Sequence, residues 1–303
     1  MVFVAKHGLE TLSRSLEDYP EGIIVPVDKP YRWTSADVVR KLKFAAKKHF
    51  GQKNIKVGHA GTLDPLATGV LIVCVGKATR LAEQIQASDK EYVAGITFGA
   101  TTPSYDLEKP IDKFYPTDGV TEEALSKALE GFTGEQEQVA PVFSAKLVDG
   151  VRSYELARKG VQDSGIVSHR IRINDITLLS FEPPVPTPPF ENRLASLDPT
   201  IRCRSWSPLS HAEGGMGFRT EGQNPSSRIN VTDNSELGLP SAKVKVSCSK
   251  GTYIRALARD LGQALGSGAH LNSLCRTACG GISVEESLSI EEAIVLFNQQ
   301  PQP

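Results

Sequence analysis

The stretch "KVGHAGTLDPLATGVLIVCVG", residues 56–76, is the most informative segment of this chain. Its β-branched residues bounded by glycines predict a buried strand over residues 69–76. Asp64 is its only acid, and it is the only carboxylate within residues 38–82, which contain nine Lys or Arg residues. Glycines let the backbone turn tightly and let another molecule approach closely, and Pro65 stiffens the chain after the acid. The turn therefore presents Asp64 on a rigid loop, either as a turn-capping residue or as a reactive carboxylate.

The segments on either side predict a mixture of strands and helices without regular alternation or an internal repeat. This mixture favours an α+β or mixed-sheet architecture over a doubly wound one. Strands are expected over 22–30, 90–100, 168–182 and 242–248, helices over 34–50, 121–132, 254–265 and 289–300, and a hairpin turn at Asp149–Gly150 followed by a short helix.

The pattern fails between residues 183 and 240. "PPVPTPP" has five prolines in seven residues, and the sequence after it is rich in Ser, Gly and Asn. Such a composition is typical of a flexible loop or a disordered insertion. We therefore expect an amino-terminal extension over 1–21, one folded domain made of 22–182 and 241–303, and an insertion over 183–240.

Charge is segregated along the chain although the formal net charge is only −1. Residues 31–60 have a balance of +7 and residues 241–280 a balance of +5, whereas residues 101–140 have a balance of −6. If the two basic zones fold onto one face, that face attracts a polyanion such as a nucleic acid. Solvated helix faces explain the same charges equally well.

The composition also limits the class of protein. The longest apolar run, residues 70–75, is too short to span a bilayer, and the amino terminus lacks the apolar core of a secretion signal, so we expect a cytoplasmic protein. The five cysteines include no CxxC pair, so we predict neither a disulfide framework nor a metal site. Cys275 and Cys279 have a spacing that faces one way on a helix. Neither GxxxxGK[ST] nor GxGxxG is present, which argues against a nucleotide-binding enzyme.

A reactive Asp64 needs a partner that favours its charged form, and a nearby guanidinium does this. Arg255 and Arg259, on the predicted helix 254–265, are the candidates.

Six blocks of sequence occur in an order that is similar to the TruB family of tRNA pseudouridine synthases, over about residues 22–182 and 241–280. The most specific block is "GHAGTLDPLATGVL". The blocks are "VDKPYRWTSADVV" (27–39), "KVGHAGTLDPLATGVLIVCVGKATR" (56–80), "DKEYVAGITFGATT" (89–102), "PVFSAKLVDGVRSYELARKG" (141–160), "CSKGTYIRALARDLG" (248–262) and "GAHLNSLCRT" (268–277).

The resemblance implies an α+β fold with a mixed, largely antiparallel sheet flanked by helices. It implies an isomerase that converts uridine 55 in the T loop of tRNA to pseudouridine without a cofactor or metal. Asp64 matches the family's essential aspartate, Arg255 the arginine that pairs with it, and Tyr92 the tyrosine that stacks on the target base and is placed for proton transfer.

The resemblance also implies a set of contacts to RNA. The enzyme must extrude its target base from the folded T arm. His59 matches the histidine that stacks where the base had been, Tyr253 and Leu274 match contacts to the uracil, and Lys90, Lys250 and the lysine-rich helix at 40–48 are expected to meet phosphates. The expected partner is the T-arm stem-loop of tRNA, bound by a monomer without a membrane or a protein partner.

Three departures from the family pattern stand out. Leu147 replaces a lysine, with Lys146 one residue early, and Pro103 and Ser104 replace an Asp-Thr pair. Only 24 residues follow Cys279, too few for the carboxyl-terminal RNA-binding domain of many relatives. Two alternatives remain: an RNA-binding or RNA-folding protein of this fold without turnover, and a relative that modifies other RNA within a guide-RNA particle, which the short carboxyl end disfavours.

Overall fold

The computed structural model describes residues 12–143, 168–185 and 229–298, together with the backbone of residues 3–4, 147–148 and 151–152. Within these residues, one sheet of ten strands forms the centre of the molecule, in the order β1-β2-β4-β13-β5-β12-β11-β8, with β3 beside β4 and β14 beside β13. The strands are β1 (Phe3–Val4), β2 (Ile23–Lys29), β3 (Val57–His59), β4 (Ala67–Val75), β5 (Lys90–Phe98), β8 (Gly134–Gln138), β11 (His169–Glu182), β12 (Ser241–Cys248), β13 (Ala269–Cys279) and β14 (Ile282–Ser283).

The sheet is mixed and largely antiparallel, which confirms the expected α+β class. Only the β1–β2 and β13–β4 pairs of this sheet are parallel among the described strands. Two further pairs lie outside it: β6 (Ala100–Thr101) with β7 (Lys113–Phe114), and β9 (Leu147–Val148) with β10 (Val151–Arg152). The last pair flanks the predicted Asp149–Gly150 turn; the turn itself and the short helix expected after it lie outside the described residues.

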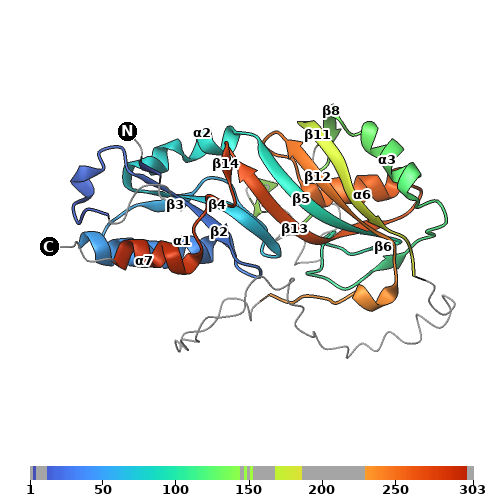
Figure 1. The fold of residues 1–303 in the computed structure, drawn as a ribbon, viewed down its shortest axis with the longest axis horizontal. Coiled ribbons are helices and arrows are strands. Elements are labelled where there is room, and N and C mark those ends of the chain that lie inside the picture. Colours follow the sequence, from blue (N-terminus) through green and yellow to red (C-terminus); the bar gives the residue numbers. More distant parts are fainter. Residues whose placement is uncertain are drawn as a thin grey trace.

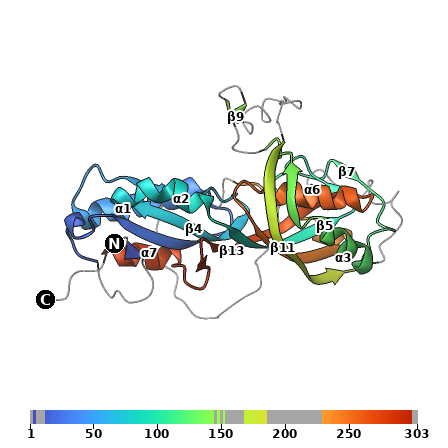
Figure 2. The same ribbon diagram turned by 90° about the horizontal axis from the view of Figure 1, so that it is seen from above.

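Helices pack on this sheet in two groups (Figure 1). In one half, α1 (Ser35–Phe50) and α7 (Ile290–Asn298) pack together against one face of β2 and β4, and the 3₁₀ helix η2 (Gly76–Leu81) and α2 (Ala82–Ala87) lie on the other face. In the other half, α6 (Ile254–Ala264) packs on β13 and β5, and α3 (Glu122–Glu130) packs on β11 and α6. Seen from above, the two groups lie at opposite ends of an elongated molecule, with β13 between them (Figure 2).

Helix α1 forms where its capping residues and apolar stripe predicted a helix. The Thr34 hydroxyl accepts a hydrogen bond from the Asp37 amide and the Asp37 carboxylate accepts one from the Thr34 amide, so both ends of a capping box are present. Gly51 ends the helix in the left-handed conformation with φ of 62°. The predicted apolar stripe, including Val38 and Leu42, is buried in the core.

Strand β4 passes very close to β13, and a glycine makes this possible. Gly69 has φ of +96°, and a Cβ atom on it would lie 2.2 Å from the carbonyl oxygen of Arg276. Gly69 therefore allows the parallel pairing that joins the two halves of the molecule. Cys275 and Cys279, whose spacing would suit one face of a helix, both lie on β13. Cys74, Cys248, Cys275 and Cys279 are free thiols.

The boundaries of the expected insertion remain a prediction. Residues 183–185 and 229–240 are described, including the 3₁₀ helix η4 (Ser235–Leu237), and residues 186–228 lie outside the described part. Of the expected extension, η1 (Leu16–Asp18) is described. No helix in the described ranges is long and apolar enough to cross a membrane.

Candidate active site

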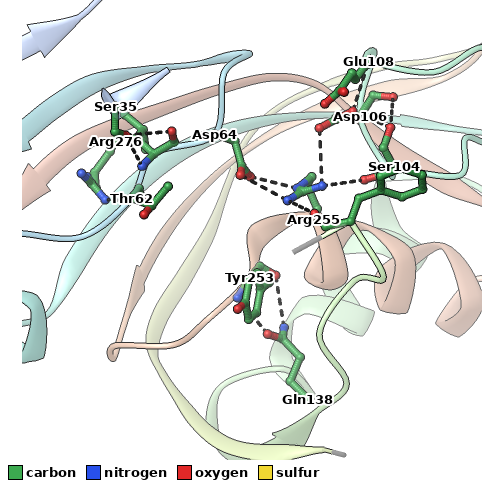
Figure 3. Close-up of polar contacts among 12 residues, drawn as sticks. Ser35, Thr62, Asp64, Ser104, Asp106, Glu108, Gln138, Tyr253, Arg255 and Arg276 are labelled. Carbon is green, nitrogen blue, oxygen red and sulfur yellow. Dashed lines mark hydrogen bonds and ion pairs between the residues drawn. The ribbon is translucent and has the colours of Figure 1, made fainter. Parts of the chain in front are cut away.

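The loop between β3 and β4 positions Asp64 where the two halves of the molecule meet (Figure 3). Its backbone is fixed from inside the protein by buried polar side chains. Ser35 accepts a hydrogen bond from the Leu63 amide at 2.9 Å and donates one to the Leu63 carbonyl at 3.1 Å. The Ala67 amide donates to the Asp64 carbonyl at 3.1 Å. These bonds fix the backbone on both sides of Asp64 and so determine where its carboxylate points.

Two buried cations complete this support. Arg276, on β13, donates to the carbonyl oxygens of Val70 at 2.7 Å, Gly61 at 3.3 Å and Thr62 at 3.4 Å. Lys29, at the end of β2, is fully buried and donates to the carbonyl of Pro65 at 3.2 Å. Its ammonium also donates to the Trp33 and Pro30 carbonyls, at 2.6 and 3.0 Å. Burial lowers the pKa of Lys29 to about 7, although the charge of Asp64 opposes this shift.

Asp64 and Arg255 form the ion pair that the sequence predicted. The Arg255 Nε lies 2.9 Å from Oδ2 of Asp64, and Nη2 donates to Oδ1 at 3.2 Å. Both carboxylate oxygens thus lie close to the guanidinium, although only the Nη2 contact has hydrogen-bond geometry. The Arg255 side chain is only 6% exposed, whereas that of Asp64 is 36% exposed. The guanidinium is therefore a buried support, and the carboxylate still has a face open to substrate.

A second carboxylate supports Arg255 from the opposite side. The Nη1 of Arg255 donates to the Ser104 carbonyl at 3.1 Å and lies 3.7 Å from Oδ2 of Asp106. Asp106 is itself held by the Ser104 hydroxyl, which donates to it at 2.6 Å, and by the Glu108 amide at 2.9 Å. Burial raises the pKa of Asp106. Burial acts to lower the pKa of Arg255, but the charges of Asp64 and Asp106 outweigh it and keep this pKa above its usual value.

The start of α6 places Arg255 in this network. Tyr253, which directly precedes this helix, is fixed by Gln138 at the end of β8, which accepts a hydrogen bond from the Tyr253 amide at 2.8 Å and donates to the Tyr253 carbonyl at 3.3 Å. The Tyr253 ring meets that of His169 edge to face, with ring centroids 5.9 Å apart. Arg259, the other candidate partner of Asp64, instead pairs with Asp260 at 2.7 Å.

A small pocket opens beside the ion pair. Asp64, Arg255 and the predicted uracil contact Leu274 line it together, so the structure brings these three expected site residues into one place. The other lining residues are Leu66, Ala67, Asp106, Leu107, Leu271, Asn272 and Ser273.

Tyr92 and His59 flank the loop without lining this pocket. Tyr92 is buried on β5, opposite Arg276 of β13 in the sheet register. Burial raises the pKa of Tyr92 to about 12, so its hydroxyl keeps its proton at neutral pH. His59 ends β3 half-buried, its Nδ1 has no hydrogen-bond partner among the described residues, and burial lowers its pKa. A neutral imidazole at this position suits a stacking role.

The two predicted phosphate-binding lysines differ in their surroundings. Lys250 is exposed in the turn between β12 and α6. Lys90 is buried, and its ammonium donates to the carbonyls of Gln86 and Ser88. A phosphate contact of Lys90 stays a prediction that this geometry does not favour.

Three residues that support the loop or Arg255 were not singled out from the sequence: Lys29, Asp106 and Arg276. Each lies in or beside a block quoted above, but a lysine, an acid and an arginine in such blocks give no sign of burial. Only the packing of distant strands around them reveals their contacts to the loop and to Arg255.

Comparisons with known proteins give sequence relatives of this chain. Residues 47–198 match the TruB family pseudouridylate synthase (N terminal domain). The chain is 42% identical over 283 residues to the tRNA pseudouridine synthase B of Phocaeicola vulgatus, covering 93% of this chain and 96% of that protein. It is 36% identical over 269 residues to the protein of the same name from Deinococcus radiodurans, covering 88% of this chain and 77% of that protein.

Solved structures show a similar fold at low sequence identity. A chain of a Cbf5-Nop10-Gar1 complex matches with a TM-score of 0.55 and 22% identity over 97% of this chain. A chain of an H/ACA RNP bound to a substrate RNA containing 2′-deoxyuridine matches with a TM-score of 0.52 and 21% identity over 91% of this chain. This chain spans 62% and 53% of those two chains, respectively.

Proposed function

Because the chain belongs to the TruB family of pseudouridylate synthases, and is thus an isomerase that converts uridine in tRNA to pseudouridine, we propose that Asp64 is its essential carboxylate and uridine 55 its target. The reaction breaks the bond between N1 of uracil and C1′ of the ribose and forms a bond from C5 to C1′. N1 gains a proton and C5 loses one, so substrate and product are isomers.

The observation that carries this proposal is the Asp64–Arg255 ion pair at the pocket. A carboxylate can act as a nucleophile or a base without a cofactor when its charge is stabilised and its orientation fixed. Arg255 supplies both conditions because it binds both carboxylate oxygens while being held by Ser104 and Asp106. The exposed face of Asp64 lines the pocket, where bound substrate would replace water.

The remaining expected residues complete the proposed site. Leu274 and Tyr253 contact the uracil, Tyr92 stacks on the target base through its protonated phenol, and His59 occupies the stack that the extruded base leaves. Lys250 meets a phosphate from the exposed turn before α6, as does Lys90 if substrate binding displaces its carbonyl contacts. We infer a monomer that acts on the T arm of tRNA in the cytoplasm without a protein partner.

The proposal is tested with a T-arm hairpin that carries tritium at C5 of the target uridine. Isomerisation replaces that hydrogen by one from solvent, so wild-type protein should release one label per hairpin. Asp64→Asn keeps the shape of the side chain and should lower release at least 1,000-fold, the order of magnitude expected for an essential catalytic group. Its hairpin affinity should stay within about threefold of wild type.

Two results would contradict the proposal. Binding without any release by the wild-type protein would identify it as an RNA-binding protein without turnover. Normal release by Asp64→Asn would remove Asp64 from its role. A hairpin with the label at a different uridine is the control, and it should release no tritium.

A further inference from the structure

A basic groove lies apart from the pocket beside Asp64, in the half of the molecule that contains α1. It has a volume of about 520 Å³ and lies between α1, the loop after it, β3 and η2. Four lysines line it: Lys43 and Lys47 from α1, and Lys53 and Lys56 from the loop. The other lining residues, Asn54, Ile55, Val57, Gly58 and Thr79, include no acid. We call this feature the lysine groove.

The charges of the lysine groove are not balanced by the protein. Within the described part of the chain, no ion pair involves any of its four lysines. Lys43 and Lys47 are half-buried, so some of their hydration is already lost. Like charges gathered in one concave surface repel each other, and concave walls focus their field outward. The groove is therefore suited to an anionic ligand with several charges rather than to a single ion.

An exposed aromatic residue beside the groove indicates which polyanion fits. Phe44 is 75% exposed, although an aromatic side chain on a helix of this kind is normally buried. Its surface neighbours on α1, three and four residues away, are all basic: Arg40, Lys41, Lys47 and Lys48. An exposed ring within a field of cations is the combination that binds nucleic acid, because bases stack on the ring while the cations contact phosphates.

The groove lies close to the loop of Asp64 along the chain. Gly58 lines it, and the next residue, His59, is the expected stacking residue. Asp64 is the sixth residue after Gly58, so this end of the groove lies within about 22 Å of its backbone even if the chain were fully extended. An RNA that occupies the active site and extends past His59 is therefore long enough to reach the lysine groove.

Given the proposed function, we propose that the lysine groove binds the phosphate backbone of the substrate RNA next to the T loop, and that Phe44 stacks on an exposed base or sugar at its rim. The groove acts on affinity and not on the chemical step. It is separate from Lys250, which contacts the RNA from the other half of the molecule.

The test compares two variants of the full chain that remove equal charge. The groove variant is Lys43→Gln/Lys47→Gln/Lys53→Gln, and the control is Lys113→Gln/Lys127→Gln/Lys243→Gln, three exposed lysines elsewhere. The affinity for the T-arm hairpin and for full-length tRNA is measured from about 50 to 300 mM salt. The groove variant should lose about two to three units of the slope of log affinity against log salt, and about tenfold to 100-fold in affinity at 0.1 M salt.

The aromatic contact has its own comparison. Phe44→Ala should weaken binding roughly 5- to 150-fold, the range measured for loss of one base-stacking aromatic. Val295→Ala, an exposed apolar residue on α7, is the matched control and should leave affinity unchanged. Both substituted positions face solvent, and circular dichroism checks that the fold is retained.

Each outcome separates this proposal from the proposed function. Unchanged affinity and salt slope in the groove variant for both RNAs would overturn the groove assignment, and a polyanion other than substrate RNA, or a protein, would then be its ligand. Tritium release by the wild type is unaffected by that result. If the wild type releases no tritium but the groove variant has a reduced slope of log affinity against log salt, the proposed reaction is contradicted. The lysine groove then remains an RNA-binding surface.

Discussion

The buried cluster around Arg255 and the lysine groove both contain cationic side chains, yet they use them in opposite ways. In the buried cluster the Arg255 guanidinium faces the carboxylates of Asp64 and Asp106 and donates to two backbone carbonyls. In the lysine groove, the ammonium groups of Lys43 and Lys47 have no carboxylate partner among the described residues. A fully paired charge orients a neighbouring group, and an unpaired one remains available to a ligand.

This difference predicts which measured quantity a substitution in each region changes. Loss of a buried, paired charge leaves its partners uncompensated and disorders the carboxylate, so the rate of the chemical step falls. Loss of an exposed, unpaired charge weakens a screened, long-range attraction, so affinity and its salt dependence change instead. Substitutions in the two regions therefore separate an effect on rate from an effect on affinity.

Arg255→Lys should have the largest effect, because an ammonium cannot reproduce the contacts of the planar guanidinium to both oxygens of Asp64. We expect turnover to fall about 100- to 10,000-fold while hairpin affinity stays within a few fold. Single-turnover tritium release at saturating enzyme measures the chemical step directly. A rate within tenfold of wild type would show that a point charge suffices and that contact with both oxygens is not required.

Asp106→Asn should have a smaller effect of the same kind. The variant keeps the bond from the Ser104 hydroxyl but loses the charge that lies 3.7 Å from Arg255, so the guanidinium is held less firmly. We expect a decrease of roughly tenfold to 100-fold in kcat with little change in KM. If KM rises instead and kcat is retained, Asp106 acts in substrate binding and not in positioning Arg255.

Lys29→Met should change the pH dependence of stability. The folded-state pKa of Lys29 is lowered to about 7 from 10.5, so between pH 7 and 10 the unfolded chain binds more protons than the folded one. The free energy of unfolding of the wild type should therefore rise across this window through Lys29, and this rise should be absent from the variant. Urea unfolding at pH 6, 7, 8 and 9 measures both proteins, and parallel curves would contradict a buried, titrating Lys29.

Arg259→Gln should have the smallest effect. Arg259 lies one turn after Arg255 on α6 but pairs with Asp260 and donates to the Val139 carbonyl at 3.0 Å. We expect turnover within about threefold of wild type, which makes this variant the matched control for Arg255→Lys. A loss as large as that of Arg255→Lys would show that both arginines reach the carboxylate during the reaction.

Local patterns were sufficient for most of the fold. The helix at 35–50 follows from its apolar period and its Thr34 cap, and β4 from its run of β-branched residues. Cys275 and Cys279 show where spacing alone is insufficient, because a spacing of four does not distinguish a helix from a long strand that contains a bulge near residue 277. Periodicity is a weak guide where both states bury the same residues.

The site was only partly accessible from the sequence. Asp64 was conspicuous as a lone acid in a basic interval, and the resemblance to a family singled out Arg255, 191 residues away. Neither Asp106 nor Lys29 was identified, because their roles depend on burial created by strands that are distant in sequence. The basic helix at 40–48 was expected to meet phosphates, but its contribution to a groove with Lys53 and Lys56 became visible only from the packing of α1 against β3.

The division of labour between the two regions is tested most directly by measuring single-turnover tritium release and hairpin affinity side by side for Asp64→Asn and for Lys43→Gln/Lys47→Gln/Lys53→Gln. We expect Asp64→Asn to lose at least 1,000-fold in rate with nearly unchanged affinity. We expect the groove variant to lose about tenfold to 100-fold in affinity at 0.1 M salt and to keep its rate at saturating enzyme within a few fold. The contrary result, in which Asp64→Asn retains its rate or the groove variant binds as tightly as wild type while its rate falls, would contradict the separation of chemistry from substrate binding.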